Sequence, residues 1–239
     1  ALFPTLLKTD PHPPVRLEAA RGLAAFDDPK LASTVLAAWA DYPPPVRAEL
    51  VNALAGRKEW AKQLLRAIDA KAVDRRDLTD NVVLRIQAFG DADLNGLVEK
   101  SWGRTRPTPK ELDATIEKMR AELAQPGSFA RGKVVFDNQC AKCHKFDGRG
   151  NEVGPPLDGA ARDIEYILAN VIDPNRVIGA PYFQRIARTD DGRVEQGILA
   201  EEDDQFLTLK VENGVLKKIA KKDLDGPVKV LEKSMMPEG

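Results

Sequence analysis

The chain has 239 residues, of which 43% are hydrophobic and 31% charged, and its formal net charge is −1. This balance is typical of a globular protein with one large domain or two modest ones. The near-zero charge argues against general binding to nucleic acid, and charged residues interrupt every apolar run before it reaches the length of a membrane span.

The first part of the chain repeats itself. The segments PPVRLEAARGLA (13–24) and PPVRAELVNALA (44–55) align without gaps. Each begins with prolines, which the first turn of a helix tolerates, and continues with good helix formers. Between them, DPKLASTVLAAWADY predicts a second helix, with Asp28 as its cap and Pro29 at the first helical position. Helix pairs at a fixed period predict an α-solenoid over residues 1–106, similar to short HEAT repeats.

The segment RPTPKELDATIEKMRAELAQPG predicts an amphipathic helix, which we place as a connector at residues 107–127. Thr108 and Glu111 have the spacing of a capping box at its start. Four apolar residues fall on one face of this helix: Leu112, Ile116, Met119 and Leu123.

The third part, residues 128–239, changes from helical to strand-like patterns. Ser128 caps a predicted helix that runs into a pair of cysteines, and a second helix, DIEYILANVID, ends at Pro174. Alternating residues with Asp-Gly and Asn-Gly dipeptides then predict an antiparallel β-meander of three or four strands at about 181–221. The predicted fold is mainly α, with this meander inserted into a helical domain.

The stretch NQCAKCHKF contains Cys140, Cys143 and His144 in the order that attaches haem c. The two thiols bond to the porphyrin vinyl groups, and the adjacent histidine is the proximal iron ligand. A zinc site would need a fourth ligand, for which His12 or a carboxylate remains. A thioredoxin-like redox pair would need a βαβ context, which the sequence does not predict.

The far side of the iron needs a second ligand, and the chain offers His12, Met119, Met235, Met236 and lysines. His12 lies in a proline-rich segment of the first domain, and Met119 lies on the apolar face of the connector. The terminal pair of methionines is therefore favoured. Met236 directly precedes Pro237, which restricts its backbone to extended conformations.

The segments WGRTR, ARGKVVFDNQCAKCHKF, GPPLDGAARD, ILANVIDPN and SMMPEG together resemble the planctomycete-type haem-binding domain. In that family, HEAT-like repeats precede a c-type cytochrome domain with a β insertion. The resemblance implies one covalent haem c, with the Pro155 carbonyl accepting a hydrogen bond from the His144 ring. It also implies that Met236, in Met-Pro-Glu-Gly, is the second iron ligand. Gly132 and Phe136 resemble the small and aromatic pair at which cytochrome c helices cross closely.

The resulting functional expectation is an electron carrier that is not an enzyme by itself. The resemblance implies a fused or partner dehydrogenase as electron donor. Haem attachment of this kind implies a periplasmic or secreted location. Two alternatives stay open: a peroxidase-like haem enzyme with an open or displaceable distal ligand, and an interaction scaffold in which the repeats act and the haem is structural.

Several further residues have both a functional and a structural interpretation. Arg162 and Arg176 are suited to binding the haem propionates, and the simpler interpretation is solvation at the surface. Trp102 is suited to contact with the haem edge, and the lysines in 217–222 to binding an acidic partner; the simpler interpretations are packing and a solvated strand end. An uncovered face around Gly132 would favour a homodimer.

Overall fold

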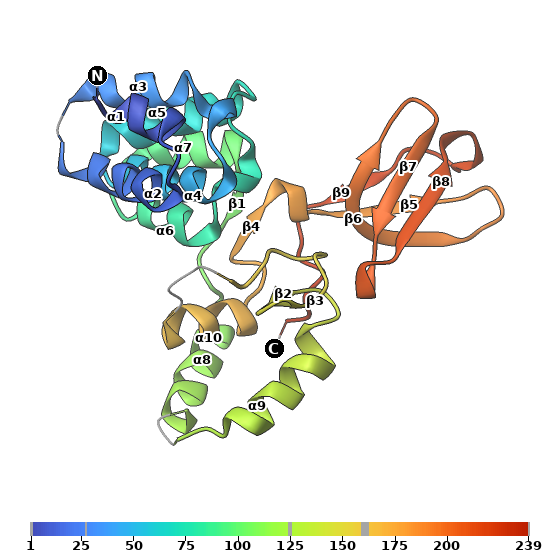
Figure 1. Cartoon of the computed structure of the whole chain (residues 1–239). Coiled ribbons are helices and arrows are strands. Elements are labelled where there is room, and N and C mark those ends of the chain that lie inside the picture. Colours follow the sequence, from blue (N-terminus) through green and yellow to red (C-terminus); the bar gives the residue numbers. More distant parts are fainter. Residues whose placement is uncertain (1, 27, 124–125, 159–162, 239) are drawn as a thin grey trace. The chain divides into compact units, whose positions relative to one another are not determined.

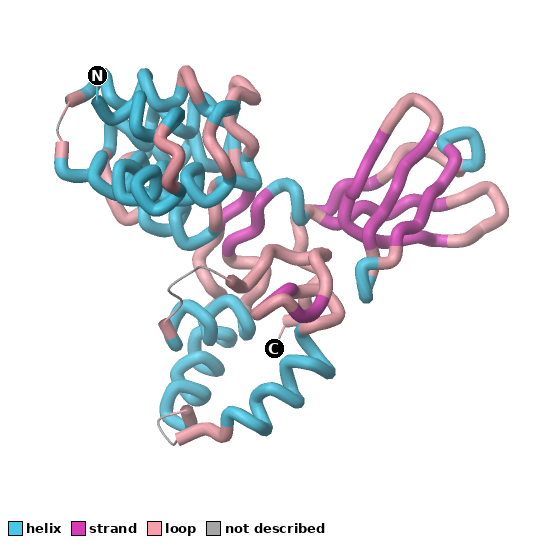
Figure 2. Tube along the Cα trace, viewed as in Figure 1, coloured by secondary structure: helices cyan, strands magenta, loops and turns pink. Residues whose placement is uncertain are grey.

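The computed structural model describes residues 2–26, 28–123, 126–158 and 163–238 of the chain. The chain divides into two units, Ala1–Arg104 and Thr105–Gly239, and each is described here by itself. The first is built from helices, whereas the second contains both helices and a sheet (Figure 2). Of the helices that the structure describes, none has the length and apolar character needed to cross a membrane.

The helices of the first unit alternate between two rows (Figure 1). They are α1 (Leu2–Thr9), α2 (Pro13–Gly22), α3 (Pro29–Leu36), α4 (Pro44–Leu54), α5 (Lys58–Asp69), α6 (Asp80–Gln87) and α7 (Ala92–Ser101). Helix α2 packs on α4, α3 on α5, and α5 on α7. Helices two apart in the sequence are thus neighbours, which is the packing of a helical solenoid. The predicted cap is confirmed, since the Asp28 carboxylate accepts a hydrogen bond from the Lys30 amide.

Arginines connect successive repeats of this unit. Arg57 donates to the carbonyl of Ala24 at 3.2 Å, and Arg85 donates to the carbonyl of Asn52 at 2.7 Å. In both cases the partners are 33 residues apart, close to the repeat period. The repeats therefore share polar contacts as well as a continuous apolar core.

The second unit begins with three helices: α8 (Lys110–Glu122), α9 (Phe129–Val135) and α10 (Ile164–Ile172). The side chain of Ser128 caps α9, as the sequence predicts, and that of Asp163 caps α10. The predicted capping box of α8 is wrong. Pro109, with an extended backbone, occupies the N-cap position, so Thr108 lies one residue too far from the helix to cap it.

Helices α8 and α10 form a small core. Ile116 of α8 packs with Leu168, Ala169 and Ile172 of α10, and Leu112 and Met119 lie partly buried beside them. The guanidinium of Arg120 on α8 donates hydrogen bonds to two acidic side chains, Glu165 on α10 and Glu117 on its own helix. The apolar face predicted for the connector thus packs on α10, although Leu123 is half exposed.

An antiparallel sheet follows α10 in the chain. Its strands, in spatial order, are β8 (Leu216–Ala220), β7 (Phe206–Lys210), β6 (Val194–Glu202), β5 (Gln184–Arg188) and β9 (Lys229–Leu231). Strands β5 to β8 form the predicted meander. The sheet extends beyond the predicted span of 181–221, because β9 adds to the free edge of β5, with Gln184 opposite Leu231. This strand has only three residues, too few to show an alternating pattern.

The sheet has its own apolar core of Ala187, Leu207, Leu209 and Ile219. The turn between β7 and β8 places Asn213 and Gly214 at φ of 61° and 70°. Glycine and asparagine adopt these left-handed angles most readily, so the Asn-Gly signal identified this turn correctly. The remaining short strands of the structure are β1 (Gly103–Thr105), β2 (Lys145–Phe146), β3 (Arg149–Gly150) and β4 (Val177–Gly179).

A buried ion pair fixes the end of α10. The guanidinium of Arg106 donates to both carboxylate oxygens of Asp173, at 2.8 and 2.7 Å. The side chain of Asp173 is fully buried, and that of Arg106 is 23% exposed. The Arg106 amide also donates to the carbonyl of Arg176 at 2.9 Å. The turn that follows α10 is therefore held by side-chain and backbone contacts from the start of the unit.

We expect Asp173→Ala to destabilise the second unit by about 3 kcal/mol, because it leaves the Arg106 guanidinium without its partner. The value is at the low end for a broken buried pair, since Arg106 keeps some contact with water. Hydrogen exchange of the α10 amides in the full chain should accelerate accordingly. The amides of α4, in the other unit, serve as the internal control. Unchanged exchange in α10 would contradict the assigned role of the pair.

Candidate haem-binding site

The cysteine motif lies where α9 passes through a π-helical turn at Phe136–Cys140. The amides of Cys143 and His144 both donate to the carbonyl of Cys140, at 3.0 and 2.8 Å. The two cysteines and the histidine are thus arranged on a single turn of backbone. Both thiols are free and partly exposed.

Burial raises the pKa of the Cys140 thiol. The pKa of Cys143 is also raised, mainly by burial and further by the charge of Glu212. Both groups are therefore neutral thiols near pH 7, which limits metal binding and oxidation through the thiolate. The described residues contain no group of three or more His, Cys, Asp or Glu side chains placed to hold a metal ion.

The imidazole of His144 has a fixed orientation. Its Nδ1 lies 2.8 Å from the carbonyl oxygen of Pro155. A carbonyl can only accept, so the proton resides on Nδ1, and the lone pair of Nε2 remains for a metal ion. The amides of Val153 and Gly154 donate to the carbonyl of Cys143, which holds this loop against the motif. The contact that the resemblance implies between His144 and Pro155 is present.

Two glycines are required by the closeness of this loop to His144. A Cβ on Gly154 would lie 2.6 Å from Cε1 of the ring, and a Cβ on Gly150 would lie 2.1 Å from the backbone oxygen of His144. Gly150 also has φ of 88°, which disfavours other residues. Any side chain at Gly154 would displace the imidazole.

The sheet contacts the cysteine motif through the turn between β7 and β8. The amide of Asn213 donates to the carbonyl of Lys142, which lies between the two cysteines, at 2.8 Å. Lys210 donates to the carbonyl of Glu152 at 2.8 Å. The sequence motif alone gave no sign of this support, since these partners are far apart in the chain.

Apolar side chains are exposed on both helices that follow the connector. None of the residues of α9, all of which the structure describes, is buried. The exposed large apolar side chains of this region are Phe129, Val134, Val135, Phe146, Ile164, Ile167 and Val171. Phe136 and Phe146 make an edge contact, with ring centroids 5.8 Å apart. Two thiols, an oriented imidazole and apolar side chains are a donor set and a surface that fit a haem.

The terminal methionines lie on a loop after β9, and both are partly buried. The Met236 amide donates to Oγ of Ser234 at 3.0 Å. The Ser234 amide in turn donates to Oδ1 of Asn175 at 2.8 Å. The sequence made the methionines candidate ligands but gave no sign of Asn175, whose bond to this loop joins residues 59 apart in the chain.

The structure describes the surroundings of most of the other candidate residues. His12 is exposed at the start of α2, and the Trp102 indole is buried and donates to the carbonyl of Leu78 in the first unit. Met119 packs in the α8–α10 core. Arg176 is partly exposed, and Arg162 lies outside the described residues. A Cβ added at Gly132 would meet no atom within 4 Å, so no close helix crossing occurs there in the described part of the chain.

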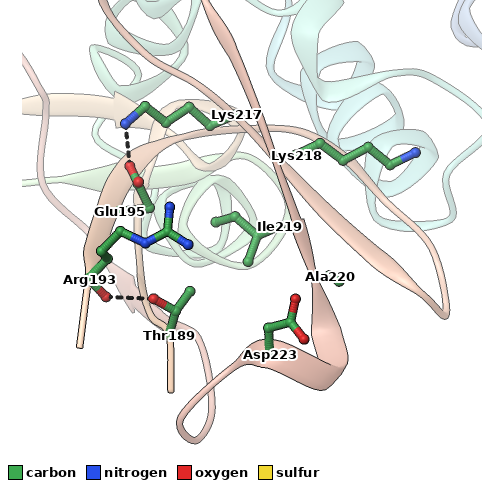
Figure 3. A pocket seen from close by; sticks show the side chains of 8 residues that line it. All are labelled: Thr189, Arg193, Glu195, Lys217, Lys218, Ile219, Ala220 and Asp223. Atoms are coloured by element: carbon green, nitrogen blue, oxygen red, sulfur yellow. Dashed lines mark hydrogen bonds and ion pairs between the residues drawn. The ribbon is translucent and has the colours of Figure 1, made fainter. Parts of the chain in front are cut away.

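A shallow pocket of about 330 Å³ lies on the sheet, and none of its lining residues belongs to the cysteine motif. Figure 3 shows that charged and polar side chains line it together with Ile219 and Ala220, and that Lys217 pairs with Glu195. Lys218 lies over the ring of Phe206, and Lys221 pairs with Glu202. These pairings satisfy much of the positive charge in 217–222, which supports a solvated strand end.

Two family models match the chain. Residues 1–79 match HEAT repeats, and residues 129–203 match cytochrome c. A segment similar to HEAT repeats is thus followed by a segment similar to cytochrome c, in the order that the sequence motifs predicted. The cytochrome c match indicates a haem-binding electron carrier. No curated protein matches the sequence.

We expect Gly154→Ala to destabilise the haem-containing protein by about 1–3 kcal/mol, because its Cβ would force the His144 ring or the loop to move. Gly132→Ala is the matched control. A methyl group there meets open space in a helix and should be neutral or stabilising by about 0.5–1 kcal/mol. Denaturant unfolding followed at the haem absorption compares the two variants, and equal midpoints would contradict the prediction.

Proposed function

We propose that the second unit transfers electrons through one haem c, attached covalently by Cys140 and Cys143. His144 and Met236 are the proposed iron ligands. The observation that carries the proposal is the contact between His144 Nδ1 and the carbonyl of Pro155. It leaves Nε2 as an electron-pair donor to a metal, on the residue that directly follows the cysteine pair. When bound, the haem supplies a one-electron ferrous–ferric couple.

The residues of the chain determine how that couple behaves. The Pro155 carbonyl orients the His144 ring and makes it a stronger donor to a metal. The cysteines fix the position of the porphyrin, and the loop at Gly154 sets how closely the backbone approaches the ring. A methionine as the second ligand raises the reduction potential relative to histidine.

The proposal includes a source of electrons and a location. We propose a dehydrogenase, fused to this chain or binding it, as the electron donor, and a periplasmic or secreted site of action. Both rest on the family resemblance and on the extracytoplasmic attachment of haem c. Rapid binding of cyanide or carbon monoxide at neutral pH would instead favour the peroxidase-like alternative, since it would show a displaceable distal ligand.

Covalent attachment is tested by removing the thiols one at a time. Cys140→Ala and Cys143→Ala should each lose one thioether, so the denatured protein should show the spectrum of a haem with one intact vinyl group. The unmutated protein should retain its haem in acidified organic solvent, and free extraction of the haem would overturn the attachment. Expression in the cytoplasm without export should yield protein without haem.

The distal ligand is tested with the neighbouring methionines. Met236→Ala should abolish the weak far-red sulfur-to-iron charge-transfer band and lower the reduction potential. Met235→Ala is the matched control and should keep the band. The reverse result would assign the ligand to Met235, and a band that survives both substitutions would exclude the terminal loop.

A further inference from the structure

The loop that carries Met235 and Met236 is held on both sides by one side chain, Asn175. Its Oδ1 accepts from the Ser234 amide at 2.8 Å, before the methionines. Its Nδ2 donates to the carboxylate of Glu238, after them. A single amide therefore spans the segment and bonds to it at two points that are four residues apart.

Ser234 passes this restraint on to Met236. The hydroxyl of Ser234 accepts from the Met236 amide at 3.0 Å, so the position of Asn175 fixes the backbone of Met236 through one intermediate residue. Gln184 on β5 donates to the carbonyl of Ser234 from the sheet side. Pro237 further limits the conformations of Met236. Ser234 thus bonds both to the turn after α10 and to the sheet.

The turn that carries Asn175 is itself held by a buried ion pair. It follows Pro174 in the turn after α10, where the buried carboxylate of Asp173 binds both guanidinium nitrogens of Arg106. The carboxylate of Glu238 lies 3.8 Å from the same guanidinium. Arg106, Asp173 and Asn175 form a polar cluster, which we call the loop clamp, and it connects the start of the unit to its terminal loop.

We propose that Asn175 is a positioning residue that keeps Met236 available as the distal ligand, with the Arg106–Asp173 pair as its support. The inference rests on the proposed function of Met236. Asn175 would not touch the haem; it acts by lowering the freedom of the loop, so that the sulfur of Met236 outcompetes other ligands. Without these hydrogen bonds, another ligand would replace the methionine at the iron more readily.

The test uses the full chain with covalent haem and measures displacement of the distal ligand by imidazole. Asn175→Ala removes two hydrogen bonds from the loop and should let imidazole bind about tenfold more tightly. Asn175→Asp keeps the acceptor for the Ser234 amide but sets a carboxylate against that of Glu238, so its effect should be at least as large as that of Asn175→Ala. The far-red band should weaken in the same order.

Asn170→Ala is the matched control. It removes an amide from α10, the helix before the turn that carries Asn175, but its side chain donates to the carbonyl of Tyr166 within α10. Its imidazole affinity should equal that of the unmutated protein. Thermal unfolding and covalent haem content show whether each variant is folded. If Asn175→Ala is not recovered folded, the Asn175→Asp variant decides the question by the same titration.

The outcomes separate this inference from the proposed function. If Met236→Ala keeps the far-red band, the ligand assignment fails, whatever Asn175 does. If Met236→Ala loses the band while both Asn175 variants behave like Asn170→Ala, Met236 remains the ligand and the positioning role is overturned. A loss of thermal stability in the Asn175 variants without any change in imidazole affinity would mean that the loop clamp is only structural.

Discussion

The ion pair between Arg106 and Asp173 is the interaction on which the arrangement of the second unit depends. It joins the first residues of the unit to the end of α10, which are 67 residues apart in the chain. A fully buried carboxylate is costly unless it is paired, and Arg106 supplies two hydrogen bonds in the planar geometry that suits it. Because the pair fixes the turn after α10, it also fixes where Asn175 presents its amide. The terminal loop, which comes much later in the chain, is then bonded to a turn that is already in place.

The sheet brings the terminal segment of the chain back to the turn that carries Asn175. More than fifty residues separate Asn175 from Ser234, and a flexible loop of that length would lose conformational entropy on closing. Strands β5 to β8 order most of this segment, and β9 pairs with β5 beside the turn. Gln184, at the start of β5, holds the terminal segment at two points, since it pairs with Leu231 and donates to the carbonyl of Ser234. The sheet thus places the loop that carries the methionines next to the turn after α10. It also supports the cysteine motif, through the hydrogen bond from the Asn213 amide to the carbonyl of Lys142.

The sequence predicted those parts of the fold and site that depend on short-range signals. Capping residues, prolines and the turn at Asn213 identified helices and hairpins, and the spacing of Cys140, Cys143 and His144 identified the haem motif. The predictions failed or were silent where the answer depends on distant partners. The capping box at Thr108 was a local pattern displaced by Pro109, and the short strand β9 exists only because β5 offers an edge. Asn175 resembles any asparagine after a helix until its partners at the end of the chain are known.

The two sides of the proposed iron site are consequently built in different ways. The proximal side is local: Cys140 to Pro155 form one compact loop with its own backbone hydrogen bonds. The distal side is assembled from segments far apart in the chain, which the sheet and the loop clamp hold together. Under the proposed function, attachment of the haem and retention of the distal methionine therefore depend on different contacts. A change in the loop clamp should act on retention of the methionine while attachment persists, because the hydrogen bonds described within Cys140–Pro155 do not involve the residues of the clamp. The sheet contacts both sides of the site, since Asn213 bonds to Lys142 and Gln184 bonds to Ser234, so a change in the sheet should affect both properties.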